Sequence, residues 1–305
     1  MRNLITLFDL QPDDIREIFE RARILKSECR NGERKPLLAG RVLTQVFQKP
    51  SLRTRLSFEA AMIQLGGGAI FVSNKDAGLE GREAAADVAR VIGGYSDVIV
   101  LRTFEQSLIE EFASCAGCTV VNGLSDESHP CQALTDLFTM EEALGKLSGR
   151  KLVYVGDGNN VARSLARACA MLGVSLAIAA PAKYQLSAEC LKQIQDRFPS
   201  ADITQHVDPE SAVQDADVVY TDVWASMGQE DEKDQRQAIF ADYQVNAALM
   251  SAAAPGAKFM HCLPARRGLE VTDDVMDGPA SLAFPQAENR MHLAKGLLAW
   301  LLADD

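Results

Sequence analysis

The sequence predicts an α/β protein built from two doubly wound parallel sheets. Short runs rich in aliphatic and β-branched residues alternate with helical stretches, which is the pattern of parallel strands joined by covering helices. These runs are too many for one compact sheet, and a length of 305 residues suits about two domains. We therefore expect one domain over residues 1–132, a second over 133–285, and a C-terminal helix over 286–305.

In the first half of the chain, β-rich runs bounded by glycine or polar residues predict the first set of strands. They cover residues 42–47, 69–73, 98–102 and 119–122. After the first of these runs, Leu56 and Phe58 belong to a helical pattern that stops at the glycine pair 66–67. Ser51 stands just before this pattern and is therefore a natural N-cap.

The second half predicts the second sheet. A helical run over residues 132–143 separates the halves and ends at Gly145 and Gly149. The expected strands cover residues 151–155, 174–179, 217–221, 258–260 and 281–284. A final helix over 287–302 carries Leu293, Leu297 and Leu301 on one side, so it should dock onto another part of the protein.

Composition and charge exclude several classes of protein. A hydrophobic fraction of 47% and a charged fraction of 24% are those of an ordinary globular chain with a substantial core. The formal net charge of -11 repels nucleic acid and anionic membranes at long range. We therefore expect neither as a partner.

The N-terminal stretch and the cysteines of the sequence indicate a reducing compartment. Asp9 interrupts the N-terminal stretch before a signal peptide could form, and no uncharged run approaches the roughly 18 residues of a spanning helix. We expect a cytoplasmic protein.

The 7 cysteines are an odd number spread along the chain, which disfavours a disulfide framework. Cys115 and Cys118 have the spacing of half a zinc site, but nothing completes it, so we favour apolar thiols and expect no metal.

Polar side chains follow the strands of the first half, where an α/β sheet binds ligands. Ser51, Arg53 and Arg55 follow the first strand at the start of a helix, where a hydroxyl, free N–H groups and cations suit an anion of phosphate size. Arg102 ends the third strand, and His129 and Gln132 follow the fourth. Each residue alone could be structural, but together they suit a small dianion beside a polarised carbonyl.

The second half opens with a strand, a glycine turn and a helix, as in a dinucleotide-binding fold. Binding of NAD is disfavoured for two reasons. Val161 occupies the position of the third glycine in the dinucleotide-binding motif, and Pro181 stands near the end of the next strand, where an acidic residue should bind a ribose hydroxyl. Asp222 and Cys262 end two later strands. Asp222 could be a helix cap and Cys262 a core thiol; alternatively, this edge suits a zwitterion that carries an extra amine.

Four motifs in this order resemble those of the carbamoyltransferase family, and within it the branch that acts on ornithine. They are the segments Ser51 to Arg55, His129 to Gln132, Asp222 to Gly228 and His261 to Pro264, supported by Gly156 to Asn160 and by Ala287 to Arg290. The resemblance covers nearly the whole chain. It implies two α/β domains, a final helix that returns to the first domain, and a homotrimer with shared sites.

The resemblance also implies the roles of individual residues. Carbamoyl phosphate would be bound by Ser51, Leu52, Arg53, Thr54, Arg102, His129, Gln132, Cys262, Leu263 and Arg290. L-Ornithine would be bound by Asn160, Asp222, Ser226 and Met227, and the catalytic residues would be Arg53, Arg102, His129, Asp222 and Cys262. The implied reaction needs no cofactor: a neutral δ-amine attacks the carbonyl carbon, and phosphate leaves toward the Ser51 helix end.

Departures from the family pattern keep alternatives open. Gly78 stands where many relatives have a glutamine that a neighbouring subunit contributes, Arg266 replaces a common histidine, and Lys295 replaces a common amide. The alternatives are a transferase for acylated ornithine, putrescine or aspartate, and a silent relative that binds carbamoyl phosphate for regulation. Retention of Ser226 and Met227 after Asp222 favours free ornithine.

Overall fold

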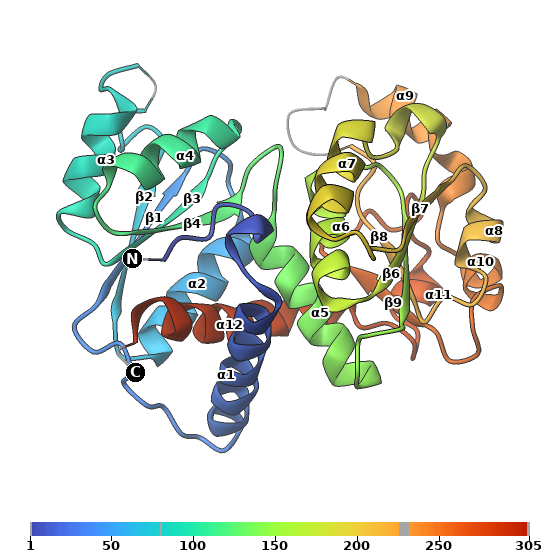
Figure 1. Cartoon of the computed structure of the whole chain (residues 1–305), viewed down its shortest axis with the longest axis horizontal. Helices are drawn as coiled ribbons and strands as arrows, with labels where there is room; N and C mark the ends of the chain where they lie inside the picture. The colour runs from blue at the N-terminus through green and yellow to red at the C-terminus, as the bar shows by residue number, and fades with distance from the viewer. Residues whose placement is uncertain (1, 80, 226–231, 304–305) are drawn as a thin grey trace. The chain divides into compact units, whose positions relative to one another are not determined.

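Alternating strands and helices build two parallel sheets, one in each of two units of the chain (Figure 1). In the computed structural model, unit 1 comprises Met1–Leu134 and Glu288–Asp305, and unit 2 comprises Thr135–Ala287. The structure describes residues 2–79, 81–225 and 232–303. The predicted α/β fold with two parallel sheets is confirmed.

The sheet of unit 1 has the order β2-β1-β3-β4, and all its pairings are parallel. Its strands are β1 (Val42–Phe47), β2 (Gly68–Ser73), β3 (Val98–Arg102) and β4 (Thr119–Leu124), so the expected strands of the first half are confirmed to within two residues. The chain moves outward from β1 to β2 and then crosses to β3 on the other side. A topological switch point therefore lies between β1 and β3, and ligands bind beyond the carboxyl ends of strands at such points.

Helices precede and alternate with the strands of unit 1. They are η1 (Leu7–Asp9), α1 (Pro12–Arg30), α2 (Leu52–Gln64), α3 (Ala85–Gly93) and α4 (Gln106–Cys115). Val88 of α3 and Phe112 of α4 belong to one apolar cluster with Val46, Ile99 and Val120 of the strands. Burial of this face against α3 and α4 holds the sheet in place.

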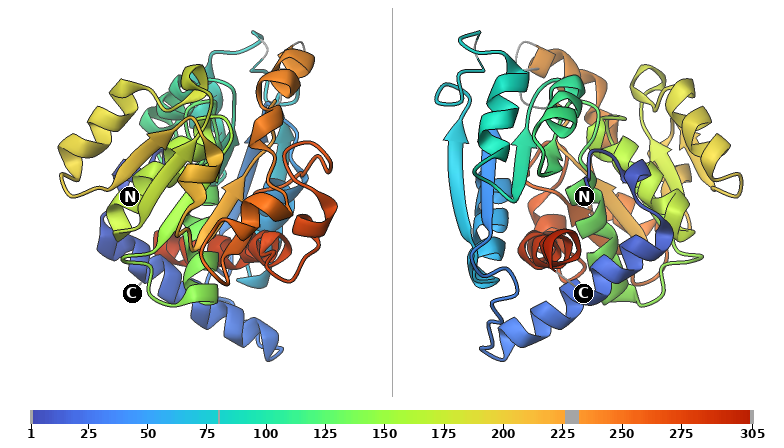
Figure 2. Two further views of the ribbon diagram at one scale, coloured as in Figure 1. Left: turned by 90° about the vertical axis from the view of Figure 1, so that its right-hand side faces the viewer. Right: turned by 60° about the vertical axis from the view of Figure 1, so that its left-hand side comes forward.

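Two helices pass from one unit to the other along the chain. They are α5 (Pro130–Leu144) and α12 (Ala283–Leu302). Within unit 1, α12 lies beside α1, as Figures 1 and 2 show in red and dark blue. The two helices approach closely at Gly296, where a Cβ would lie 2.6 Å from the Ile18 carbonyl oxygen. The expected docking of the final helix onto the first half of the chain is confirmed.

The sheet of unit 2 has the order β7-β6-β5-β8-β9, again with parallel pairings throughout. Its strands are β5 (Lys151–Val155), β6 (Ser175–Ala179), β7 (Ile203–His206), β8 (Val218–Thr221) and β9 (Lys258–His261). The switch point of this sheet lies between β5 and β8, because the chain adds β6 and β7 on one side and β8 and β9 on the other.

One predicted strand is wrong and one strand was missed. Residues 281–284 contain only an isolated bridge from Ser281 to Phe259, and α12 begins at Ala283. The missed strand, β7, is an edge strand in which Thr204, Gln205 and His206 replace the apolar run expected of a buried strand. The strand β7 forms because pairing with β6 outweighs its local composition, whereas residues 281–284 form no ladder and lead into α12.

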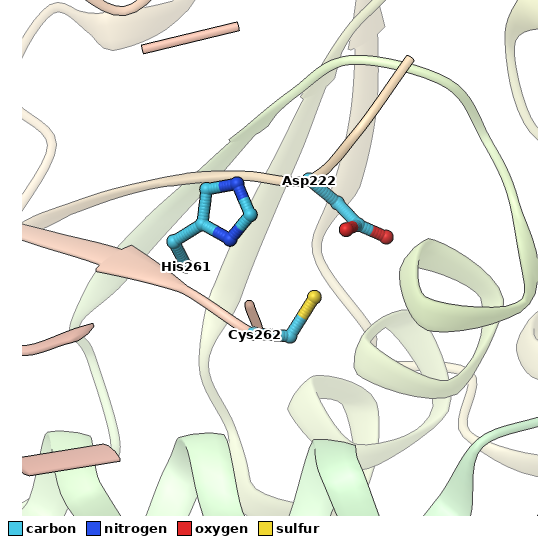
Figure 3. A group of neighbouring side chains, drawn as sticks. All are labelled: Asp222, His261 and Cys262. Carbon is cyan, nitrogen blue, oxygen red and sulfur yellow. The ribbon is translucent and has the colours of Figure 1, made fainter. Parts of the chain in front are cut away.

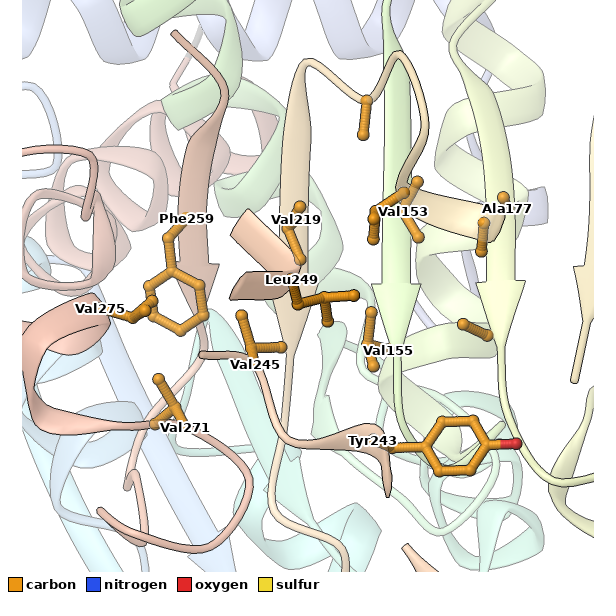
Figure 4. Packing of buried hydrophobic residues seen from close by; sticks show 14 of the residues in the cluster. Val153, Val155, Ala177, Val219, Tyr243, Val245, Leu249, Phe259, Val271 and Val275 are labelled. Carbon is orange, nitrogen blue, oxygen red and sulfur yellow. The ribbon is translucent and has the colours of Figure 1, made fainter. Parts of the chain in front are cut away.

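One apolar cluster of the core of unit 2 lies on one face of the second sheet (Figure 4). Val153, Val219 and Phe259 project from three strands into this cluster, and Leu249 and Val275 meet them from α10 (Ala247–Ser251) and α11 (Asp273–Met276). The helices of this unit are α6 (Asn160–Leu172), η2 (Ala182–Tyr184), α7 (Ala188–Arg197), α8 (Pro209–Val213), α9 (Lys233–Ile239), η4 (Ala241–Tyr243), α10 (Ala247–Ser251) and α11 (Asp273–Met276). The core holds the strand ends that carry the polar residues described next.

Within the described parts of the chain, every helix is too short or too polar to cross a bilayer.

Candidate active site

The N-terminus of α2 lies at the switch point of the first sheet. The Ser51 hydroxyl oxygen accepts a hydrogen bond from the Thr54 backbone N–H at 3.3 Å and donates to Thr54 Oγ1 at 3.1 Å. The expected N-cap at Ser51 is therefore confirmed. Leu52 and Arg53 occupy the first turn of α2, where backbone N–H groups and the helix dipole favour an anion.

Arg290 joins three helices at this edge. Its Nη1 donates to Gln132 Oε1 of α5, and its Nη2 donates to Thr54 Oγ1 of α2 at 3.4 Å. All three side chains are buried. The final helix thus adds a cation to a site formed by much earlier segments of the chain.

His129 lies among the arginines of this cluster. Burial lowers the pKa of its imidazole well below the usual value, and the positive charges of Arg290, Arg102 and Arg53 lower it further. The ring is therefore neutral at physiological pH, and it can act as a hydrogen-bonding group without adding charge. Three guanidinium groups around a neutral imidazole form an electropositive site suited to a phosphate dianion.

Arg102 reaches this cluster from the end of β3. The pairing of β3 with β4 shifts register between Leu101 and Arg102, so that Leu101 pairs with Asn122 and Arg102 pairs with Leu124. Irregularities of this kind reorient side chains next to active sites. At the same place a Cβ on Gly123 would lie 2.9 Å from the Leu101 carbonyl oxygen, so this close approach requires glycine.

At the switch point of the second sheet, Asn159 and Asp222 are in direct contact. Asn159 Oδ1 accepts from the backbone N–H groups of Val161 and Ala162 at 2.9 and 3.1 Å, which caps α6. Its Nδ2 donates to Asp222 Oδ2 at 3.1 Å. The alternative that Asp222 is itself a helix cap is wrong for the next described helix, because α9 begins only at Lys233.

Cys262 directs its sulfur toward the Asp222 carboxylate (Figure 3). Burial raises the pKa of this thiol well above its usual value, and the negative charge of Asp222 raises it further. Cys262 is therefore a neutral thiol that can donate a hydrogen bond to Asp222. Neighbouring Leu263 has a positive φ of 57°, which is uncommon for a residue with a side chain.

The same region contains three side chains of the types that ligate metals. One ligand atom each from Asp222, His261 and Cys262 lies within 4.8 Å of the others. Both nitrogens of the His261 ring, however, are engaged within the protein: Nδ1 accepts from the Leu263 N–H at 2.8 Å, and Nε2 lies 3.2 Å from Glu270 Oε1. Metal ligation by His261 would break one of these two contacts. In this arrangement, both ring nitrogens take part in interactions within the protein.

The cysteines carry no disulfide. All seven lie in described segments and are free thiols. Burial raises the pKa of Cys118 to about 11, so this thiol is protonated at neutral pH. Cys118 is buried, which agrees with the interpretation of this cysteine as an apolar thiol.

The predicted site residues fall into two sets. Unit 1 contains Ser51, Leu52, Arg53, Thr54, Arg102, His129, Gln132 and Arg290, and unit 2 contains Asn160, Asp222, Cys262 and Leu263. Ser226 and Met227 lie outside the described residues. Sequence reasoning passed over Asn159 in favour of its neighbour Asn160, although the preceding turn and the helix start after it mark it as an N-cap.

Arg236 is a second residue that sequence reasoning missed. Its Nη1 donates to Asp157 Oδ2 at 2.7 Å and to the Trp224 carbonyl oxygen at 3.1 Å, while its Nε donates to Glu232 Oε2 at 2.9 Å. The side chain is buried. It therefore connects the turn after β5 to the segments on either side of residues 226–231.

Comparisons with known proteins identify the family. Residues 2–142 match the family described as "Aspartate/ornithine carbamoyltransferase, carbamoyl-P binding domain", and residues 148–301 match its "Asp/Orn binding domain". The ornithine carbamoyltransferase of Bacillus subtilis (strain 168) is 49% identical over 304 residues, covering 99% of this chain and 94% of that relative. The solved structure of ornithine carbamoyltransferase from Pyrococcus furiosus has a TM-score of 0.95 at 46% identity, covering 99% of this chain and 97% of that one.

A further relative, from Pyrococcus furiosus, carries the name "Ornithine carbamoyltransferase, anabolic". It is 46% identical over 303 residues, covering 99% of this chain and 96% of that relative. Both halves of the chain and its full length are thus matched. The chain belongs to the aspartate/ornithine carbamoyltransferase family.

Proposed function

We propose that this protein transfers the carbamoyl group of carbamoyl phosphate to the δ-amine of L-ornithine, giving L-citrulline and phosphate in arginine biosynthesis. The observation that carries the proposal is the pair of polar sites at the two switch points. One is an arginine cluster around a neutral His129, suited to a phosphate dianion. The other is a carboxylate, Asp222, with an amide and a thiol beside it, suited to an amino acid.

At the first site, we assign the phosphate group to the N-terminus of α2 and to the arginines. Ser51, Leu52, Arg53 and Thr54 would contact the phosphate oxygens, together with Arg102 and Arg290. Arg53, Arg102 and His129 would stabilise the oxyanion that forms when the carbonyl carbon is attacked. Such donors accelerate the reaction because they are already oriented toward the developing charge.

At the second site, we assign the ornithine ligands to Asn160, Asp222, Ser226 and Met227. The δ-nitrogen must be unprotonated to attack, since its lone pair forms the new C–N bond. As the C–O bond to phosphate breaks, the leaving phosphate takes that electron pair and the nitrogen releases one proton. Cys262 and Leu263 would contact the carbamoyl group, and a neutral thiol at Cys262 fits this role because it adds no negative charge.

A homotrimeric assembly and a cytoplasmic location remain predictions that rest on the family resemblance and the sequence. An exposed apolar face supports a contact between copies: Leu52, Leu56 and Ile63 of α2 are 69%, 53% and 62% exposed, and Ile70 of the edge strand β2 is 49% exposed. Apolar groups gathered in this way on a surface are typical of interaction sites.

The Gly78 departure has a local physical reason. Gly78 has a φ of +72°, in the left-handed region that glycine enters without a steric penalty. A Cβ there would also lie 3.1 Å from Arg82 Nε and from Glu83 Oε1. The glutamine that many relatives have at this position would be strained in the present loop, so any contact of this loop with carbamoyl phosphate must come from other side chains.

A substrate panel tests the proposal. The purified protein is assayed with carbamoyl phosphate and, separately, with ornithine, acetylornithine, putrescine and aspartate, and both phosphate and the carbamoylated product are measured. We expect ornithine to react at least about tenfold faster than the others, since Asp222 and Asn160 suit the ends of an α-amino acid. Preference for another amine would reassign the substrate, and binding of carbamoyl phosphate without turnover with any amine would favour the silent relative.

A further inference from the structure

The side chain of His261 is hydrogen-bonded at both ends. Its Nδ1 accepts from the backbone N–H of Leu263 at 2.8 Å, and its Nε2 lies 3.2 Å from Glu270 Oε1. His261 and Glu270 are fully buried. Because Nδ1 accepts, the proton of the neutral ring lies on Nε2 and is donated to the Glu270 carboxylate.

Glu270 contributes more than this one contact. The same Oε1 accepts from the backbone N–H of Arg266, so one carboxylate oxygen joins the ring of His261 to the chain beyond Pro264. A carboxylate can only accept hydrogen bonds. It therefore selects the tautomer of His261 in which Nδ1 remains free to accept from Leu263.

The backbone before Cys262 is also held. The N–H of His261 donates to Gln286 Oε1 at 3.0 Å, and Gln286 Nε2 donates to Asp136 Oδ1 at 2.6 Å. The N–H groups on both sides of Cys262 are therefore fixed by buried side chains. Leu263 is in the left-handed region at a φ of 57°, a conformation that persists only where the surroundings enforce it.

We propose that His261 and Glu270 are positioning residues for the carbamoyl transfer: the ring of His261 holds the Leu263 N–H and thereby fixes the turn that presents Cys262 and Leu263 to the substrates. The inference rests on the proposed function, because the turn matters for the rate only if Cys262 and Leu263 contact the substrates of carbamoyl transfer. Neither side chain touches substrate in this account. Misplacement of a catalytic turn by about 1 Å can cost about 10²-fold in rate, so such a device has a measurable effect.

Two substitutions of His261 separate positioning from structural support. In His261→Asn, the amide oxygen takes the place of Nδ1 and can still accept from Leu263, but the contact with Glu270 is lost. In His261→Gln, the amide nitrogen takes the place of Nε2 and can still donate to Glu270, but Leu263 loses its acceptor. Each variant thus keeps one of the two hydrogen bonds.

The positioning account predicts an order of kcat. We expect His261→Gln to lose about 10²-fold in kcat and His261→Asn to lose less than about tenfold, because only the asparagine keeps the turn in place. The midpoints of thermal unfolding should not follow this order, since the glutamine variant keeps the buried carboxylate paired. Equal losses, or a larger loss in the asparagine variant, would overturn the inference.

Inorganic phosphate provides an internal control. Phosphate, as a product inhibitor, should bind to the arginine cluster, which contains neither His261 nor Glu270. Its inhibition constant should change less than about twofold in both variants while kcat falls. A matched substitution, His206→Gln on the edge strand β7, should leave kcat and the inhibition constant unchanged. A parallel weakening of phosphate inhibition would show general damage and contradict a positioning role.

A second pair of variants, at Glu270, tests the positioning role if the His261 variants fail to fold. Glu270→Gln keeps an oxygen that can accept from His261 and Arg266, whereas Glu270→Leu removes it. We expect Glu270→Gln to retain at least about a tenth of kcat and Glu270→Leu to lose about 10²-fold. Equal activity in the two would overturn the inference. Absence of citrulline formation by the unsubstituted protein would instead contradict the proposed function and leave this geometry without its assigned reaction.

Discussion

Arg290 Nη2 lies 3.4 Å from Thr54 Oγ1, although the two residues are 236 positions apart in the sequence. This contact brings the C-terminal helix to the N-terminus of α2, where the phosphate of carbamoyl phosphate is proposed to bind. The close packing at Gly296 allows α12 to lie directly against α1. The anion site therefore depends on the docking of a helix that follows the whole of unit 2 in the chain.

Arg290→Lys should weaken carbamoyl phosphate binding by about tenfold or more. Lysine keeps the charge but cannot donate to both Gln132 and Thr54 from one planar group. The dissociation constant of carbamoyl phosphate measures the effect. The control is Arg30→Lys, because Arg30 lies on the exposed side of α1 and meets Glu288 only at 3.5 Å. Equal affinities in the two variants would remove Arg290 from the site.

Arg53→Ala should cost about 3 kcal/mol of transition-state stabilisation or more, which is what one donor aimed at developing charge usually contributes. The measurement is kcat/KM for carbamoyl phosphate at saturating ornithine. Arg55→Ala on the same helix is the matched comparison, because the Arg55 side chain turns to Glu59 and to the ring of Phe71. A nearly normal rate for Arg53→Ala would mean that this residue only supports the helix.

The pH dependence of the reaction rate should be determined by the amine of ornithine more than by ionisable groups of the enzyme. An amine with a pKa of about 10.4 must lose its proton, which costs about 3 kcal/mol at pH 8. The pKa of His129 is lowered and that of Cys262 is raised, so neither group changes charge between about pH 7 and 9. At low ornithine concentration, the rate should therefore rise about tenfold per pH unit and then level off in the alkaline range.

Variants at the amine site sharpen this prediction. Cys262→Ser should retain part of the activity, since a hydroxyl can still donate to Asp222, whereas Asp222→Ala should lose far more. The slope of the pH profile should persist in Cys262→Ser. A flat profile from pH 6 to 9, with chemistry shown to be rate-limiting, would exclude attack by the free amine.

His292 should make the protein less stable in acid. Burial, together with the charges of Lys295 and Lys26, lowers the pKa of His292 from 6.5 to about 4, against the opposing effect of Glu288. The unfolded chain therefore binds a proton more readily than the folded chain. The stabilisation is complete above pH 6.5 and is lost as the pH falls toward 4, with a slope of at most about 1.4 kcal/mol per pH unit.

Urea unfolding at pH 7.5, 6 and 5 measures this effect. The free energy of unfolding of the unsubstituted protein should fall across this series, and His292→Gln should fall less, because glutamine does not titrate. His206→Gln is the control for loss of a histidine. If His292→Gln and the unsubstituted protein lose stability in parallel, other groups are responsible.

Leu56→Glu should disrupt the proposed assembly. Leu56 lies in the exposed apolar face of α2, and a charge there would be desolvated in any contact between copies. Light scattering should show a smaller particle, with lower activity if sites are shared. Ile24→Glu on α1 is the matched control, since Ile24 is exposed to a similar degree, 48%. A particle of unchanged size would place the contact elsewhere.

The sequence by itself determined most of the strands, the N-cap at Ser51 and the kinds of side chain at the strand ends. These features are local: β-rich runs such as residues 98–102 form strands, and Ser51 caps a helix because its own hydroxyl reaches Thr54. The order of the motifs along the chain also indicates the family. Neither conclusion required knowledge of which strand lies beside which.

Only the tertiary structure decided the contacts that join distant residues. The meeting of Arg290 with Thr54, of Asn159 with Asp222 and of His261 with Glu270 depends on strand order and helix docking. The missed strand β7 has the same explanation, since an edge position lets polar residues pair with β6. Burial and hydrogen bonding between segments are collective, so local composition cannot specify them.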